Sequence, residues 1–268
     1  MEEIVVEAGW VAEHWQDEDV QLVDVRPPHF YLQGHLPGAV NLPTFFLAAP
    51  NGAPIGAASL AQRLGSVGIA RDTHVVAYDD GASPAAALLF RVLKLYTHPR
   101  ISVLDGGITA WRHAGFDWEY GQAMPRVVEY EPGEFDPEVL VNTEAALKLL
   151  GQNDVVFVDV RSPAEFLGLQ MTAARNGHIP GAVNIDWSNN LAQATDMIKV
   201  VRPDGELRDL YAGAGVTPEK QVIVYCQSAN RASETYMILK KLDYPRVSVY
   251  VPGWQEWGNR DDTPVDTP

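Results

Sequence analysis

Cysteine is nearly missing from this chain: among its 268 residues there is one, Cys226. A single thiol excludes an internal disulfide and any metal site built from several thiolates. The seven histidines are scattered without the spacing of metal ligands. Cys226 is therefore either a small buried apolar residue or a reactive thiol.

Basic residues and long apolar runs are also scarce. Lys and Arg number 20 against 35 Asp and Glu, and the resulting charge of -15 repels phosphates. No stretch reaches the 18 or so apolar residues of a membrane-spanning helix, and the opening residues MEEIVVEAGW lack the basic and apolar regions of a secretory signal. We therefore predict a cytoplasmic protein that binds neither nucleic acid nor membrane, and any anionic substrate must be held by local groups.

Three blocks of sequence occur twice, in the same order. LVDVRPPHFYLQGHLPGAVNL (22–42) returns as FVDVRSPAEFLGLQMTAARNGHIPGAVNI (157–185), with eight extra residues between the second Asp-Val-Arg and its His. HVVAYDDGASP matches QVIVYCQSANR, and SVLDGGITAW matches SVYVPGWQEW. The pattern indicates an internal duplication.

The duplication predicts two α/β domains. Short Val/Ile/Leu runs alternate with helical patterns such as 85–95 and 232–242, and continuous apolar runs are typical of parallel strands covered by helices on both faces. The runs are 22–25, 75–78, 102–104, 155–160, 222–225 and 248–250. A segment rich in Pro, Gly and acidic residues separates the copies, so we expect domains at 1–117 and 138–268 joined by a linker at 118–137.

Cys226 lies between an apolar run and a helical pattern that we expect to begin near Arg231. In a parallel sheet, ligands bind beyond the carboxyl ends of the strands. The first turn of the following helix would aim free N–H groups and the positive end of its dipole at the loop. Such surroundings favour a thiolate and a bound anion, and Arg231 adds a positive charge. We predict that Cys226 is a nucleophile.

Residues shared by both copies are interpreted as structural, because only the second copy carries the thiol. We expect an Asp paired with an Arg, a His-X-Pro-Gly turn and an Asn that caps a loop. A catalytic role for His178 is thus the weaker hypothesis. In the first copy Asp79 replaces Cys226, Pro84 replaces Arg231 and Thr44 replaces Trp187. The shared pairs are Asp24/Asp159, Arg26/Arg161, His35/His178, Pro37/Pro180, Gly38/Gly181 and Asn41/Asn184.

These motifs resemble the rhodanese domain. GHLPGAVNL and GHIPGAVNI, together with the six-residue loop CQSANR after a strand, carry the resemblance. The tandem arrangement with one thiol resembles two-domain thiosulfate sulfurtransferases, and the Cys-Gln loop and the ending GWQEWGNRDDTPV resemble their bacterial branch. The resemblance covers nearly the whole chain.

The resemblance implies a sulfur transfer in two steps. Cys226 would take the outer sulfur from a small anionic donor such as thiosulfate and pass it to cyanide, a thiol or a dithiol, with no metal or organic cofactor. Arg231 and Trp187 would border the donor pocket, although Trp187 is equally compatible with plain packing. A monomer is implied. The backbone N–H groups that would hold the persulfide belong to Gln227, Ser228, Ala229, Asn230, Arg231 and Ala232.

Three departures from related enzymes leave the donor open. CQSANR has neither the two basic residues that follow the cysteine in mitochondrial-type enzymes nor the Gly-Ser/Thr-Gly-Val loop of mercaptopyruvate enzymes. Glu165 stands where both types have an arginine, and VPGW replaces the usual Asp-Gly-Gly/Ser-Trp. A persulfide carrier for a protein partner, a 3-mercaptopyruvate sulfurtransferase and a phosphatase of the same fold are the alternatives. The last needs Cys-X5-Arg, whereas this chain has Cys226-X4-Arg231.

Overall fold

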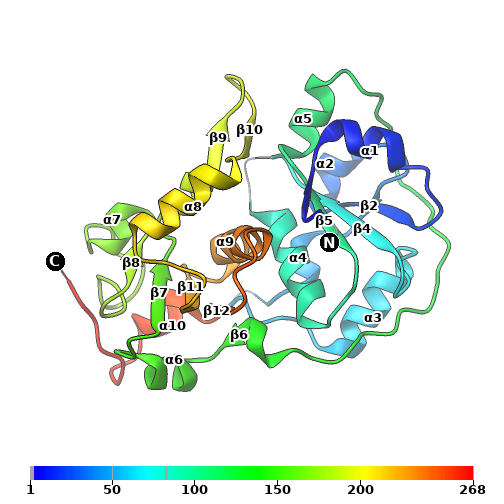
Figure 1. Ribbon diagram of the computed structural model, residues 1–268. Coiled ribbons are helices and arrows are strands. Elements are labelled where there is room, and N and C mark those ends of the chain that lie inside the picture. The colour runs from blue at the N-terminus through cyan, green and yellow to red at the C-terminus, as the bar shows by residue number, and fades with distance from the viewer. Residues whose placement is uncertain (1–2, 50, 82–83, 268) are drawn as a thin grey trace. The chain divides into compact units, whose positions relative to one another are not determined.

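The computed structural model describes residues 3–49, 51–81 and 84–267 (Figure 1). The chain forms two compact units. The first comprises Met1–Ala49, Pro54–Asp136 and Ala192–Val201, and the second comprises Pro50–Ala53, Pro137–Leu191 and Arg202–Pro268.

The first unit is built on a parallel sheet of five strands in the order β1-β5-β4-β2-β3. The strands are β1 (Val5–Val6), β2 (Val20–Asp24), β3 (Val40–Asn41), β4 (His74–Tyr78) and β5 (Ile101–Leu104). The helices are α1 (Ala8–His14), α2 (Pro28–Leu32), η1 (Thr44–Phe46), α3 (Ala57–Ser66), α4 (Ala85–Leu95) and α5 (Gly107–His113).

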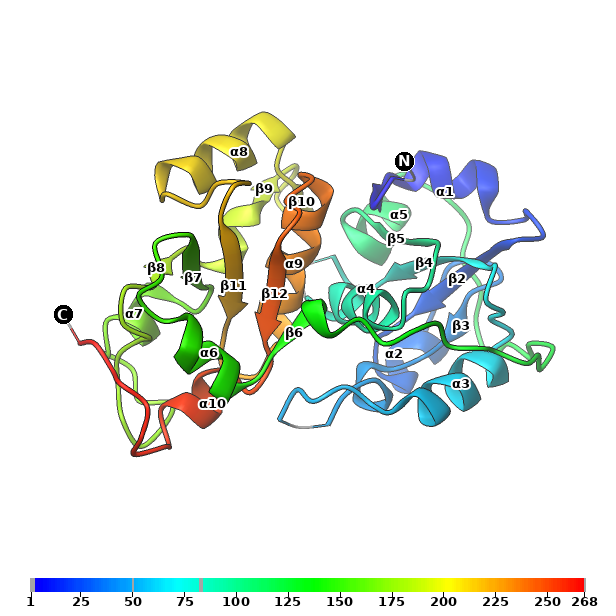
Figure 2. The same cartoon turned by 60° about the horizontal axis from the view of Figure 1, so that its bottom comes forward.

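The second unit repeats this topology, with a parallel sheet in the order β6-β12-β11-β7-β8 (Figure 2). Its strands are β6 (Leu140–Val141), β7 (Val155–Asp159), β8 (Val183–Asn184), β11 (Gln221–Tyr225) and β12 (Val247–Tyr250). Its helices are η2 (Pro137–Val139), α6 (Thr143–Leu149), α7 (Pro163–Phe166), η3 (Trp187–Asn190), α8 (Asp204–Gly213), α9 (Asn230–Lys241) and α10 (Gly253–Trp257). A separate two-stranded sheet joins β9 (Leu191–Gln193) and β10 (Lys199–Val201), and apart from Leu191 its residues belong to the first unit.

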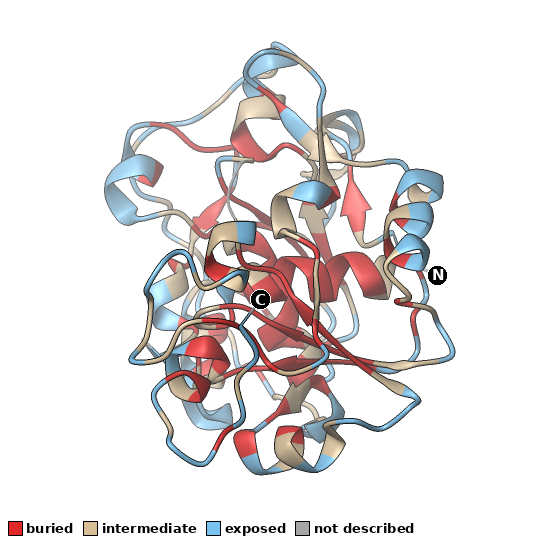
Figure 3. Cartoon of the chain, turned by 90° about the vertical axis from the view of Figure 1, so that its left-hand side faces the viewer, coloured by how far each residue is buried: buried red, intermediate tan, exposed pale blue. Residues whose placement is uncertain are grey.

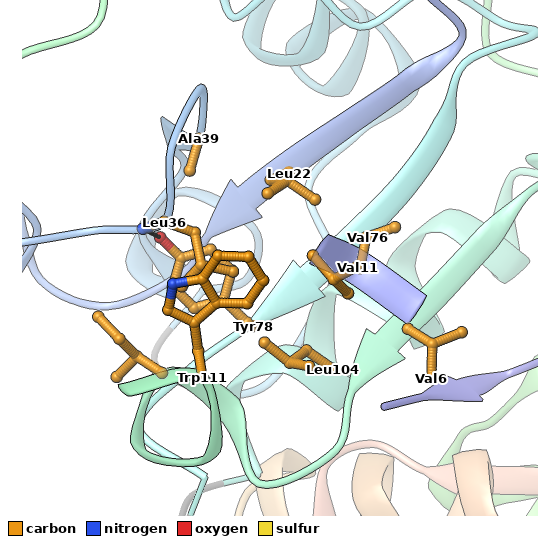
Figure 4. Packing of buried hydrophobic residues seen from close by; sticks show 10 residues of the cluster. Val6, Val11, Leu22, Leu36, Ala39, Val76, Tyr78, Leu104 and Trp111 are labelled. Carbon is orange, nitrogen blue, oxygen red and sulfur yellow. Dashed lines mark hydrogen bonds between the residues drawn. The ribbon is translucent and has the colours of Figure 1, made fainter. Parts of the chain in front are cut away.

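The strands are mainly apolar and largely buried because both faces of each sheet are covered, and Figure 3 shows the buried residues in red. Successive side chains of β4 point to opposite faces. Val76 and Tyr78 join a core with Val11 of α1 and Trp111 of α5 (Figure 4), whereas α4 packs directly on β4 and β5. The second unit has an equivalent core, in which Ile223 and Tyr225 of β11 meet Trp254 and Trp257 of α10. The expected α/β class with helices on both faces is confirmed.

The duplication extends to single hydrogen bonds. The Arg26 side chain donates from Nε to Asp24 Oδ1 at 2.9 Å, and Arg161 donates to Asp159 in the same way at 3.0 Å. Asn41 and Asn184 each donate from Nδ2 to the two carbonyls of their own Asp-Arg pair. The His-X-Pro-Gly turns have Gly38 at φ 70° and Gly181 at φ 74°. The expected structural roles of these shared residues are therefore confirmed.

Residues 118–136, all of them within the described part of the chain, form no helix or strand. They run in extended form along the first unit, with Val128 N–H donating to Gly65 at 3.0 Å and Gly133 N–H donating to Tyr96 at 3.1 Å. Tyr130 is buried, and its hydroxyl lies 3.0 Å from Nδ1 of His98. Across the described residues, no helix combines the length and apolarity that crossing a membrane requires.

Candidate active site

Cys226 directly follows β11, a central strand with neighbours on both sides, and is only 1% exposed. Its carbonyl accepts a hydrogen bond from the Trp254 N–H at 2.8 Å, and the carbonyl of Gln227 accepts one from Gln255 at 3.0 Å. These bonds tie the start of the loop to α10. The thiol thus lies at the carboxyl edge of a parallel sheet, where ligands bind in such folds.

The loop turns sharply at Ala229 before α9 begins at Asn230. Ala229 has φ 68° and ψ -16°, a left-handed conformation that is strained for a residue with a Cβ. The Ala229 carbonyl accepts hydrogen bonds from both the N–H and the hydroxyl of Ser233, at 2.9 and 2.8 Å. These two hydrogen bonds hold the strained turn in place.

The backbone amides of residues 227–232 are uncommitted: no acceptor for any of them lies among the described residues. Three of the six belong to the loop, and the other three to the first turn of a helix of 12 residues. Free amides at a helix start favour a bound anion, and the helix dipole adds to the attraction. The loop therefore combines the only thiol of the chain with donors suited to a negatively charged sulfur.

Arg231 makes a bidentate ion pair with Glu165. Nη1 lies 2.7 Å from Oε2, and Nη2 lies 2.9 Å from Oε1. The Glu165 side chain is 8% exposed and that of Arg231 is 25% exposed. The sequence led us to expect a net positive charge at the loop. The structure has an ion pair without net charge there, because the carboxylate of Glu165, 66 residues away in the chain, pairs with the guanidinium.

Glu165 is held in a capping box at the start of α7. Its Oε2 accepts hydrogen bonds from the N–H and the hydroxyl of Ser162, both at 3.0 Å. Burial raises the pKa of this carboxyl, but the hydrogen bonds from Arg231 and Ser162 outweigh it and lower the pKa to about 2. Burial lowers the pKa of Arg231, whereas Glu165 and a negative charge on Cys226 raise it, with a net rise. The Ser-X-X-Glu motif of a capping box was visible in the sequence, but its link to Arg231 was not.

Two glycines allow other segments to approach the loop. Gly253 has φ 60°, and a Cβ there would lie 2.5 Å from the carbonyl oxygen of Cys226. Gly52 has φ 80°, and a Cβ there would lie 2.7 Å from the carbonyl oxygen of Ser228. The glycine of VPGW is thus required by the loop, while Gly52 is a neighbour of the loop that the sequence did not indicate.

Trp187 opens η3, its backbone N–H donating to the Val160 carbonyl at 3.2 Å, and its side chain is half-buried. The η3 segment packs against α9, the helix that follows the cysteine loop. Its place beside a donor stays a prediction. His178 stacks on Phe166 and lies 2.9 Å from its carbonyl through Nδ1, as His35 does with Tyr31 at 3.0 Å. A structural role accounts for both histidines.

The extra residues of the second copy lie beside the loop. Gln227 donates from Nε2 to the Thr172 carbonyl at 2.9 Å, and Ala174 N–H donates to Asn259 at 2.8 Å. Leu169 and Met171 of this inserted segment are 79% and 74% exposed. A segment that is hydrogen-bonded to the cysteine loop therefore presents apolar side chains to solvent.

Within the described residues, no cluster of three or more His, Cys, Asp and Glu side chains could hold a metal ion.

Comparison with known proteins gives the same picture. The model of the rhodanese-like domain matches the chain twice, at residues 7–114 and 142–260. The chain is 31% identical to a thiosulfate sulfurtransferase of Pseudomonas aeruginosa, over 98% of this chain and 97% of that protein. It is 30% identical to a 3-mercaptopyruvate sulfurtransferase of Escherichia coli, over 97% of each. It is 32% identical to the sulfur carrier protein TtuD of Thermus thermophilus, over 98% of this chain and 96% of that protein.

Proposed function

Because the chain belongs to the family of rhodanese-like domains, we propose that it moves the outer sulfur of thiosulfate to cyanide or another thiophilic acceptor through a persulfide on Cys226. Relatives named as thiosulfate and as 3-mercaptopyruvate sulfurtransferases share the sulfurtransferase class but differ in their sulfur donor. The proposal therefore concerns the identity of the donor. The observation that carries the proposal is the run of six uncommitted amides that follows the only thiol.

In the first step the Cys226 thiolate attacks the outer sulfur of thiosulfate. A sulfur–sulfur bond forms to Cys226, the sulfur–sulfur bond of thiosulfate breaks, and its electron pair leaves with sulfite. The enzyme then carries Cys–S–S⁻, so the negative charge stays in the loop. The amides of residues 227–232 stabilise this charge without reorganising, which is the most effective kind of electrostatic catalysis.

In the second step cyanide attacks the outer sulfur of the persulfide. A carbon–sulfur bond forms, the sulfur–sulfur bond to Cys226 breaks, and its electron pair returns to Cys226 as thiolate. Thiocyanate leaves. In this proposal Arg231 orients the donor and Trp187 provides an apolar wall, so neither takes part in bond making.

The mass of the intact protein tests this assignment. After incubation with thiosulfate and removal of small molecules, wild type should gain one sulfur, about 32 Da, with one sulfite released per chain. Cys226→Ser should gain nothing while keeping the circular dichroism spectrum of wild type. A mass gain in Cys226→Ser, or none in wild type after full reduction, would rule the assignment out.

A second candidate, delivery of the persulfide sulfur to a protein partner, is favoured by the exposed Leu169 and Met171 beside the loop. One relative is named a sulfur carrier protein. Replacing both residues with Ser should slow transfer to a protein thiol and leave transfer to cyanide unchanged. Equal effects on both acceptors would count against this candidate. The domain bounds 1–117 and 138–268, a cytoplasmic location and a monomeric state stay predictions.

A further inference from the structure

The end of the Arg231 side chain is already occupied by a carboxylate of this chain. Nη1 and Nη2 each donate to one oxygen of Glu165, at 2.7 and 2.9 Å. The pair is bidentate, with the two-nitrogen fork of the planar guanidinium facing the two oxygens of the planar carboxylate. A donor that bears a carboxylate would seek the same fork, because this geometry suits a planar carboxylate best. Glu165 therefore stands where such a donor would bind.

Glu165 is also fixed in place and permanently charged. Ser162 donates two hydrogen bonds to its Oε2, both at 3.0 Å, and only 8% of the side chain is exposed. The lowered pKa of about 2 keeps the carboxylate ionised at any pH at which the protein would work. Because Glu165 is part of the fold, its effective concentration at Arg231 is far above that of a dissolved donor.

Thiosulfate differs from a carboxylate donor in the hydrogen-bond geometry that its binding requires. Its oxygens surround a tetrahedral sulfur and can each accept one hydrogen bond from a separate backbone amide. The six uncommitted amides of residues 227–232 offer such single donors. Thiosulfate thus needs the fork of Arg231 less than a carboxylate donor does.

We propose that Glu165 determines donor specificity as a tethered carboxylate, which competes with carboxylate-bearing donors for Arg231 and so selects thiosulfate. The inference rests on the proposed function of Cys226. Glu165 is a positioning residue, since it acts through Arg231 and not on the sulfur.

Glu165→Gln tests the proposal with little change to the fold, because a glutamine at this position keeps the capping box. The ratio of kcat/KM for 3-mercaptopyruvate to kcat/KM for thiosulfate should rise about ten- to a hundredfold, the range of a charge-assisted hydrogen-bonded pair. Glu206→Gln is the matched control, because it removes the same charge from an exposed pair with Arg202, and it should leave the ratio at the wild-type value. An unchanged ratio in Glu165→Gln would overturn the proposal.

Acetate provides a readout that does not depend on turnover. In Glu165→Ala the fork of Arg231 is empty, so acetate should raise the melting temperature of this variant in a saturable way. The same acetate concentrations should leave wild type and Glu165→Ala/Arg231→Leu unaffected beyond the ionic-strength effect of chloride. The absence of saturable acetate binding in folded Glu165→Ala would overturn the proposal.

The two experiments separate this inference from the proposed function. If Cys226 forms no persulfide with any donor, the proposed function fails. Acetate binding by the double variant Cys226→Ser/Glu165→Ala would still show whether Glu165 occupies a carboxylate-binding position at Arg231. If Cys226 forms the persulfide but neither the donor ratio nor acetate binding responds to Glu165, only the specificity role fails.

Discussion

Asp79 and Cys226 occupy equivalent positions at the ends of β4 and β11. The carbonyl of each accepts a hydrogen bond from the start of the second α-helix after it in the chain, from Ile108 N–H of α5 at 2.9 Å in the first unit and from Trp254 N–H of α10 at 2.8 Å in the second. The Asp79 carboxylate also accepts from the N–H groups of Gly81 at 2.8 Å and Ala86 at 2.9 Å. In the first unit a carboxylate therefore takes amide hydrogen bonds at the position that holds the thiol in the second.

The buried Asp79 predicts a pH-dependent stability of the first unit. Burial raises the pKa of Asp79 from 3.8 to about 7, against the lowering effect of its two amide hydrogen bonds. The folded state thus binds a proton that the unfolded state releases, so the contribution of Asp79 is most favourable below pH 4 and is lost as the pH rises to 7. In Asp79→Asn this dependence should vanish. The free energy of unfolding of Asp79→Asn minus that of wild type should increase by about 2–4 kcal/mol between pH 4 and pH 8.

Urea unfolding at a series of pH values measures this difference. Asp80→Asn is the control, because it removes the same charge from the exposed neighbouring residue. A difference that stays flat with pH for Asp79→Asn would show that Asp79 is ionised in the fold throughout this range.

Gly253 should tolerate no side chain. In Gly253→Ala the new Cβ would press on the carbonyl oxygens of Cys226 and Gln227, at 2.5 and 2.7 Å, in a left-handed conformation that alanine disfavours. We expect a loss of about 1–3 kcal/mol in unfolding free energy and a fall in kcat for sulfur transfer of at least tenfold. Gly213→Ala, at a helical glycine with open space around it, should be neutral or stabilising. Equal kcat in both variants would contradict the role of Gly253.

Arg231 should act on donor binding more than on chemistry. Arg231→Ala leaves the buried Glu165 carboxylate without its guanidinium partner, so its charge would repel an anionic donor and KM for thiosulfate should rise about tenfold or more. Arg231→Ala/Glu165→Gln removes that charge and should recover part of the loss. Steady-state kinetics with cyanide as acceptor measures both. A wild-type KM in Arg231→Ala would exclude Arg231 from the donor site.

The Asp159–Arg161 pair should be more costly to break than its counterpart in the first unit. Both of its side chains are fully buried, whereas Arg26 in the Asp24–Arg26 pair is 12% exposed. Arg161→Met would leave Asp159 charged without a partner, at a cost of about 3–5 kcal/mol. Arg26→Met should cost less, because water reaches that site. Chemical unfolding of the two variants gives the comparison, and a larger loss in Arg26→Met would refute it.

Elements with a long apolar period were predictable from the sequence. The helix expected at 85–95 is α4 with the same bounds, and the six predicted strands differ from the observed ones by one or two residues at one end or, for β2, at both ends. The edge strands β1, β3, β6 and β8 were missed, because a strand of two residues has no period of its own. They form only where a neighbouring strand offers hydrogen bonds.

Within the candidate site, the duplication allowed the sequence to single out Cys226 and to assign the Asp-Arg pairs, the glycine turns and the asparagines to structure. The internal duplication made this assignment possible, because a residue that occurs in both copies does not account for a thiol that occurs in only one. The sequence also indicated a loop with free amides, because any helix start leaves its first N–H groups without partners.

The charge of the loop, however, was decided by the tertiary structure. Arg231 is predicted from the sequence to be a free cation, but the fold brings Glu165 of α7 to it, and the two side chains pair across 66 residues. No local pattern reports such a contact, because ion pairing depends on which surfaces meet in space and on how much water they exclude. The sequence by itself singled out Cys226 as the candidate nucleophile, and the tertiary fold, which brings Glu165 to Arg231, determined what charge the loop presents.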